Sequence, residues 1–167
     1  MAHDPLFEMF RQIDEQNRMA YLAEKFVDMR NEGVRPGVYI AIADNNQYNQ
    51  GETSDRKPCC SIDAWHKYWQ IAAMKLDNEM ECSCCGKKIY TLISDPRCIK
   101  ESQGFDEEGK PDQPENHKAH GGHIYVKDVA IPEGLYITPL CPHCNGQHKQ
   151  NISIQEGAII VEEICSK

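Results

Sequence analysis

Four cysteines occur as two pairs with the spacing of metal-binding knuckles. Two residues separate the thiols in each pair, which are Cys82 with Cys85 and Cys141 with Cys144. Two thiolates at this spacing on a tight turn can face one ion, with zinc–sulfur distances of about 2.3 Å. Four such sulfurs complete a tetrahedron and leave no open coordination position. The sequence therefore predicts one structural zinc ion bound by these four cysteines.

The residues next to these cysteines suit such a knuckle. Gly86 follows the first pair directly and lets the chain reverse there. Pro142 lies inside the second pair and is compatible with the first turn of a short helix, whose free amides favour thiolates. Cys84 could replace Cys82 only with altered geometry, so we leave it out of the ligand set. A redox dithiol is the alternative, but nothing around either pair follows a thioredoxin pattern.

The total number of cysteines bears on the redox compartment. The chain has nine cysteines in 167 residues, and its first residues lack the basic start and apolar core of a secretory signal. An odd count without an export signal argues against a disulfide framework. We therefore expect a cytoplasmic protein in which four further cysteines are free thiols: Cys59, Cys60, Cys98 and Cys165.

Composition and charge exclude several classes of protein. Hydrophobic residues make up 40% and charged residues 26%, which excludes a fibrous or wholly disordered chain. No apolar run approaches the ~20 residues that span a bilayer. The net charge of −8 argues against a large basic patch for nucleic acid. Lys87, Lys88, His148 and Lys149 could form a local cationic spot near the cysteines, although an ordinary solvated rim is favoured, and the acidic residues 106–108 could repel a nucleic-acid backbone or screen the site.

A histidine-bearing segment lies between the two cysteine pairs. The sequence HGGHI covers residues 120–124 and leads into a β-like run, and Asn145 follows the second pair directly. This order of parts resembles the HNH endonuclease superfamily, in its treble-clef (ββα-metal) form built on zinc knuckles. The resemblance covers residues 80–164 and does not include the first 80 residues. It implies a divalent-metal-dependent nuclease that hydrolyses the phosphodiester bonds of nucleic acids.

The resemblance also implies roles for individual residues. His123 would be the general base that activates a water, and a second ion, Mg²⁺ or Mn²⁺, would stabilise the phosphate. Asn145 would hold that ion, with His148 and His120 as candidate further ligands. The family usually has an Asp or His ligand just before the catalytic histidine, and this chain has Gly122 there.

Two interpretations without catalysis also remain for His123 and for the protein. His123 could be a core residue or could orient a zinc-bound thiolate. The protein would then be a catalytically inactive, zinc-stabilised scaffold that binds another protein, through its acidic surface or a helix bearing Trp65 and Trp69, or that mimics nucleic acid. We expect His117 and His143 to face solvent.

Two amphipathic helices are predicted in the first 80 residues. Apolar residues recur at helical spacing over residues 5–31, and Gly33 provides a stop. A second helix is predicted over residues 62–78, with Trp65 and Trp69 on its apolar face as core anchors. One register of the first helix is Leu6, Phe10, Ile13, Asn17, Ala20, Glu24 and Val27, and its apolar face is widened by Phe7, Met9, Tyr21, Leu22 and Phe26.

The remaining segments complete an α+β fold. A short strand at 38–43 and an exposed polar loop at 44–58 follow the first helix. A polar insertion covers 95–119. Further β-like segments are 89–93, 120–126 and 135–137, and a closing β-hairpin pairs 151–154 with 158–164. We expect an N-terminal helical region, residues 1–79, packed on a zinc-stabilised treble-clef domain, residues 80–167, and we leave the oligomeric state open.

Overall fold

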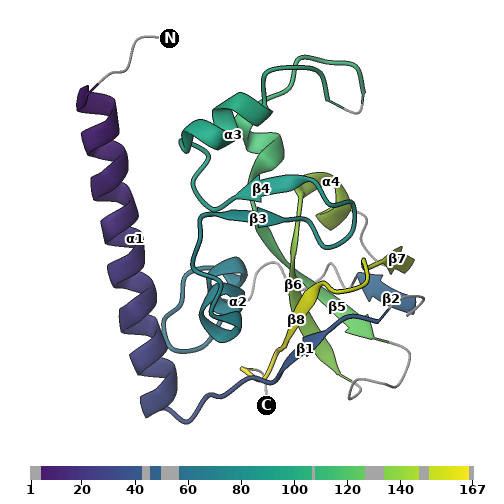
Figure 1. Ribbon diagram of the computed structural model, residues 1–167. Helices are drawn as coiled ribbons and strands as arrows, with labels where there is room; N and C mark the ends of the chain where they lie inside the picture. Colours follow the sequence, from purple (N-terminus) through teal and green to yellow (C-terminus); the bar gives the residue numbers. More distant parts are fainter. Residues whose placement is uncertain are drawn as a thin grey trace.

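The computed structural model describes residues 5–42, 46–49, 57–106, 108–126, 134–146 and 151–165. A long N-terminal helix stands beside two antiparallel sheets, so the predicted α+β class is confirmed (Figure 1). The helices are α1 (Pro5–Asn31), α2 (Trp65–Ala73), α3 (Pro96–Glu101), the 3-10 helix η1 (Pro114–His117) and α4 (Pro142–Asn145). The strands are β1 (Val38–Ile40), β2 (Asn46–Asn49), β3 (Glu79–Glu81), β4 (Lys88–Tyr90), β5 (His120–Val126), β6 (Leu135–Leu140), β7 (Asn151–Ser153) and β8 (Ile159–Glu162).

The larger sheet combines strands from both ends of the chain. Its order is β1-β8-β6-β5-β2-β7, and β3 and β4 form a separate two-stranded sheet. The predicted closing hairpin of 151–154 with 158–164 is wrong, because β7 pairs with β2 while β8 pairs with β1 and β6. The segment 44–58, expected to be an exposed loop, contains β2, which pairs with both β5 and β7. The polar sequence NQYN carries no strand periodicity, so its two pairing partners decide its structure. Residues 43–45 and 50–56 lie outside the described part.

Helix α2 packs its aromatic face on the large sheet. Trp65, Tyr68 and Trp69 are buried there, which confirms the prediction that the two tryptophans anchor the core. The Tyr68 hydroxyl donates a hydrogen bond to the Glu162 carbonyl at 2.7 Å, and the Trp69 indole donates to the Ile159 carbonyl at 3.0 Å. Buried polar tips of aromatic side chains need such partners. The bonds therefore dock α2 onto β8 in one orientation.

Helix α2 is shorter than the predicted helix over 62–78. Cys60 and Ser61 have φ values of 62° and 57°, and Ala64 is extended with φ −156° and ψ 147°, so the helix begins only at Trp65. At the other end, Met74 adopts the left-handed conformation with φ 55° and its amide donates to carbonyls of the last turn. This cap ends the helix although apolar residues continue after it.

Helix α1 has the predicted limits but packs through a different face. Its buried residues are Arg18, Leu22 and Met29. The register expected to face the core, from Leu6 to Val27, is exposed at all seven positions. The expectation is wrong for this register and right for Leu22, because α1 carries apolar residues on two faces and contact with α2 selects between them.

The insertion at 95–119 is ordered by contacts with β4. It contains α3 and η1, and the Ala119 amide donates to the Tyr90 carbonyl at 2.8 Å. His117 is 4% exposed, so the prediction that it faces solvent is wrong. Its ring nitrogens lie 2.6 Å from an Asp112 carboxylate oxygen and 3.2 Å from the Lys88 carbonyl oxygen. These two acceptors hold the insertion against the strand that follows the first cysteine pair.

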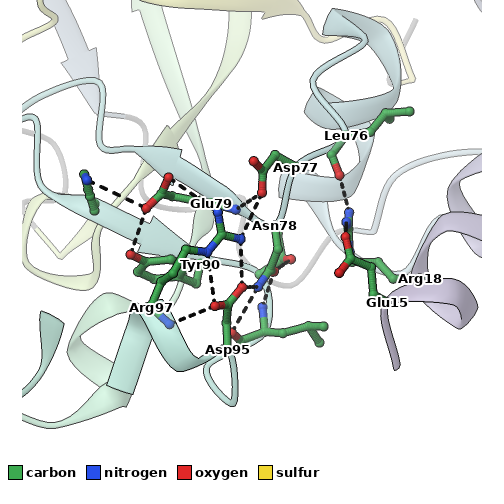
Figure 2. Close-up of polar contacts among 12 residues, drawn as sticks. Glu15, Arg18, Leu76, Asp77, Asn78, Glu79, Tyr90, Asp95 and Arg97 are labelled. Carbon is green, nitrogen blue, oxygen red and sulfur yellow. Dashed lines mark hydrogen bonds and ion pairs between the residues drawn. The ribbon is translucent and has the colours of Figure 1, made fainter. Parts of the chain in front are cut away.

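A polar network joins α3 to the β3–β4 hairpin (Figure 2). The Asn78 amide donates to the Asp95 carboxylate at 2.9 Å, and the Arg97 guanidinium donates to the same carboxylate at 2.8 Å. Arg97 also bonds Asp77 at 3.1 Å and forms an ion pair with Glu79 at 3.6 Å. Burial alone would raise the pKa of Asp95, but the hydrogen bonds from Arg97 and Asn78 outweigh it and lower that pKa to about 2. The network fixes the hairpin that carries the first knuckle.

Candidate metal centre

The two cysteine pairs meet at one point. The sulfur atoms of Cys82, Cys85, Cys141 and Cys144 all lie within 4.8 Å of one another. Zinc–sulfur bonds of about 2.3 Å in a tetrahedron require sulfurs roughly 3.8 Å apart. The Sγ atoms of Cys85 and Cys141 are 3.8 Å apart. The four cysteines can therefore hold a metal ion, as predicted, and Cys84 lies outside this group.

Each pair is shaped by local backbone geometry. Cys82 directly follows β3, and its amide donates to the Lys87 carbonyl at 2.8 Å while the Gly86 amide donates back to the Cys82 carbonyl at 2.8 Å. Gly86 has φ +78°, a conformation that glycine adopts without strain. At the second pair, Cys141 caps α4, because its Sγ accepts a hydrogen bond from the Cys144 amide at 3.4 Å. The predicted short helix at this pair is confirmed.

The electrostatics of the cluster favour a bound cation. A hydrogen bond from Cys141 lowers the pKa of Cys82, and the same bond raises the pKa of Cys141. Burial raises the pKa of Cys144. The cluster thus favours one thiolate beside protonated thiols, and all four sulfurs could be thiolates in so small a volume only with a compensating positive charge. An all-sulfur tetrahedral donor set is the type that suits zinc.

Hydrogen bonds tie the first knuckle to the large sheet. The hydroxyls of Ser83 and Thr138 are 2.6 Å apart, and the Ser83 amide donates to the Pro139 carbonyl at 2.9 Å. The Gln155 amide donates to the Ser83 carbonyl at 2.8 Å. A metal at the cysteines would thus join the end of β3 to the end of β6, and the Gln155 hydrogen bond adds the segment that leads into β8.

Two glycines in β5 allow close packing on both faces of that strand. A Cβ added at Gly121 would lie 2.5 Å from backbone and side-chain atoms of Trp65. A Cβ added at Gly122 would lie 2.2 Å from Cδ1 of Leu140 and 3.4 Å from Oδ1 of Asn145. Position 121 therefore faces α2, and position 122 faces β6 and α4.

The faces of β5 separate two residues that the resemblance assigns to one reaction. Successive side chains of a strand point to opposite faces, so His123 shares the α2 face with position 121. Its ring is 4.6 Å from that of Trp65 in an edge-on contact, and the residue is 4% exposed. Asn145 lies on the other side, beside Gly122. The structure thus brings Asn145 to the strand but does not bring His123 and Asn145 to the same face of it.

The remaining candidate site residues are His120, which begins β5, and the histidines His143 and His148 near the second cysteine pair. Burial lowers the pKa of His120, and Lys118 adds to the effect. His143 is exposed, as expected, and His148 lies outside the described residues. In the predicted cationic spot, Lys88 forms an ion pair with Glu79 at 3.9 Å, and Lys149 lies outside the described residues.

His66 is a half-buried imidazole that the sequence did not single out. Desolvation, with smaller contributions from the charges of Lys67 and His120, lowers its pKa to about 4. Its backbone reaches β5 because position 121 has no side chain. Only that close approach of α2 brings His66 near His120, so no local motif could have signalled it.

Two of the cysteines expected to be free thiols form a disulfide. Cys59 and Cys165 are joined, with a Cα–Cα distance of 5.3 Å and a sequence separation of 106 residues. The expectation is wrong because the pairing of β1 with β8 and the docking of α2 bring these distant positions together. Cys60 and Cys98 are free, as expected, and both are buried.

Comparisons of the chain with protein-family models, curated proteins and solved structures give no match. No helix among the described residues is long and apolar enough to cross a membrane.

Proposed function

We propose that the chain is a zinc-stabilised, HNH-like treble-clef protein whose role is to bind another protein. Cys82, Cys85, Cys141 and Cys144 hold the structural zinc. The observation that carries the binding role is the position of His123, which is buried against Trp65 on the face of β5 opposite Asn145.

Two further features support binding over catalysis. A general base must reach the proton that it removes, directly or through one water. The burial of His123 beneath α2 opposes such access. The space in front of position 122 is filled by Leu140, so an acidic ligand there would need the core to repack. The net charge of −8 also disfavours a polyanionic substrate.

A metal-dependent nuclease is the second candidate, and one observation favours it. The Asn145 side-chain oxygen lies 3.4 Å from the position of a Cβ at Gly122, so the helix that carries the second cysteine pair does reach the histidine strand. In this alternative, Asn145 would hold Mg²⁺ or Mn²⁺ and His123 would be the base. It requires α2 to move away from β5.

A cleavage assay separates the two candidates. Plasmid and single-stranded DNA are incubated with the chain and Mg²⁺, Mn²⁺ or Ni²⁺, beside His123→Ala and the matched control His143→Ala, which replaces an exposed histidine. The binding role predicts no cleavage above the metal-only background for any of the three proteins. Cleavage by the parent and by His143→Ala, but not by His123→Ala, would establish the nuclease instead.

A further inference from the structure

The exposed face of α1 has the repeat of a coiled-coil seam. Its positions are separated by alternating steps of four and three residues, which is a heptad pattern: Leu6, Phe10, Ile13, Asn17, Ala20, Glu24 and Val27. We call these seven residues the α1 seam. At a rise of about 1.5 Å per residue, the seam is roughly 30 Å long. A strict period of 3.5 residues keeps one face of a helix turned toward a second helix.

The seam lies on the side of α1 that faces away from the protein. All seven of its residues are exposed, and Leu6, Phe10, Ile13 and Val27 are between 44% and 56% exposed. The buried residues of the same helix, Arg18, Leu22 and Met29, are offset from the seam by about half a turn. Figure 1 shows α1 at the outer edge of the molecule, beside α2. Several large apolar side chains exposed along one face mark an interaction surface.

We propose that the α1 seam binds an amphipathic helix of a partner protein, and that this helix carries basic residues beside its apolar face. The heptad spacing makes a helix the occupant that fits, because its side chains can fill the holes between seam residues. The inference rests on the proposed binding role and names the surface that performs it.

Charge on and beside the seam selects a basic helix. Glu24 belongs to the seam, and its 4.0 Å ion pair with Lys25 leaves the side chain 69% exposed. Asp14, Asp28 and Arg30 lie at flanking positions, so acidic residues outnumber basic ones there. The Asp28 side chain is 39% exposed and forms an ion pair with Lys25 at 3.6 Å. Flanking charges of a coiled coil set the choice of partner. Lysine or arginine opposite these carboxylates would pair with them, whereas acidic residues would be repelled.

A second copy of this chain fits the seam poorly because of Glu24. In a parallel pair, Glu24 would face its own copy, and like charges directly opposite each other are destabilising. In an antiparallel pair, Glu24 would lie against an apolar seam residue such as Ile13 or Leu6. A carboxylate buried without a partner carries a large desolvation cost. A basic partner helix avoids both arrangements.

Fluorescence anisotropy with a synthetic probe tests the proposal. The probe is a labelled peptide of about four heptads with leucine at the seam positions and lysine at the flanking positions. It is titrated with the zinc-loaded chain and with Phe10→Glu. The matched control is Gln12→Glu, which places the same charge on the same helix away from the seam. Thermal unfolding followed by circular dichroism verifies that both variants are folded.

We expect the parent and Gln12→Glu to bind the lysine probe alike, and Phe10→Glu to bind at least about tenfold more weakly. A probe with glutamate in place of lysine should bind more weakly than the lysine probe, and the difference should shrink at high salt. Equal binding by Phe10→Glu and Gln12→Glu, or no binding by the parent, would overturn the proposal.

Sedimentation velocity of the chain without peptide tests whether a second copy of the chain binds the α1 seam instead of a partner helix. We expect a single species that Phe10→Glu does not change. A dimer that Phe10→Glu dissociates would overturn the partner helix in favour of a second copy. DNA cleavage by the parent would instead overturn the binding role, whatever the peptide does, so the two failures can be told apart.

Discussion

Leu140 fills the space into which any side chain at position 122 would project. A Cβ at Gly122 would lie 2.2 Å from Cδ1 and 2.8 Å from Cγ of Leu140, which is itself fully buried between β5 and its neighbours. Gly122, the second glycine of the HGGH segment, therefore leaves the space that the Leu140 side chain on β6 occupies. The pair forms part of the core.

A double-mutant cycle tests this packing. We expect Gly122→Ala to destabilise the chain by about 1–3 kcal/mol, because overpacking forces neighbouring side chains to shift. Leu140→Ala should cost about 2–5 kcal/mol through the cavity that it leaves. In the double variant the added methyl group occupies part of that cavity, so the two costs should sum to more than the measured loss. Urea unfolding measures all four proteins, and strictly additive losses would contradict the predicted contact.

Metal analysis tests the ligand set. Cys141→Ser should lose bound zinc and unfold the segments around β3 and β6, since structural zinc supplies about 10 kcal/mol or more of apparent binding free energy in small domains. Cys84→Ser is the matched control, because Cys84 lies in the same knuckle but outside the four-sulfur group. We expect one zinc per chain in the parent and in Cys84→Ser. Zinc retained by Cys141→Ser with unchanged melting would show that the ligand set is wrong.

Acid titration of stability tests the Asp95 network. The folded pKa of Asp95 is about 2, below the value of about 3.9 in an unfolded chain. The unfolded state therefore binds the proton first as the pH falls. The contribution to the free energy of unfolding is complete above about pH 4 and is lost as the pH falls through 2. A difference of nearly two pKa units corresponds to about 2.5 kcal/mol of folding free energy.

Asp95→Asn should remove that part of the pH dependence and lower stability at pH 7 by about this amount. Asp14→Asn replaces an exposed aspartate on α1 and serves as the control. Urea unfolding at a series of pH values between 2 and 7 makes the comparison. If Asp95→Asn and the parent lose stability in parallel below pH 4, Asp95 is not the group that titrates.

Reduction tests the bond between Cys59 and Cys165. A cross-link across 106 residues restricts the unfolded chain. In the chain-entropy description, a loop of this length raises the free energy of unfolding by about 5 kcal/mol. We expect a reductant to lower the urea midpoint of the parent toward that of Cys165→Ser. Cys165→Ser has no Cys59–Cys165 bond to reduce, so we expect the reductant to leave its urea midpoint unchanged. A shift in that midpoint would instead report an effect of the reductant on the zinc cysteines. A parent midpoint insensitive to the reductant would mean that the bond adds no stability.

Short-range features of this protein follow from neighbouring residues in the sequence. The spacing of Cys82 and Cys85 with Gly86 behind them predicted a knuckle, and Pro142 with Cys144 predicted a helix start; the structure has both. The limits of α1 were also predictable, because periodicity and a stop at Gly33 act within a few residues. The four cysteine ligands could be predicted from the sequence for the same reason, because each Cys-x-x-Cys pair is a local motif.

Long-range features were decided by tertiary structure. The face of α1 that packs, the burial of His117, the bond between Cys59 and Cys165, and the separation of His123 from Asn145 depend on partners far along the chain. Local periodicity states which residues share a face, and it does not state which of two apolar faces meets α2. That choice depends on how the elements pack and pair as a whole, because burial and hydrogen bonding are satisfied between segments and not within them.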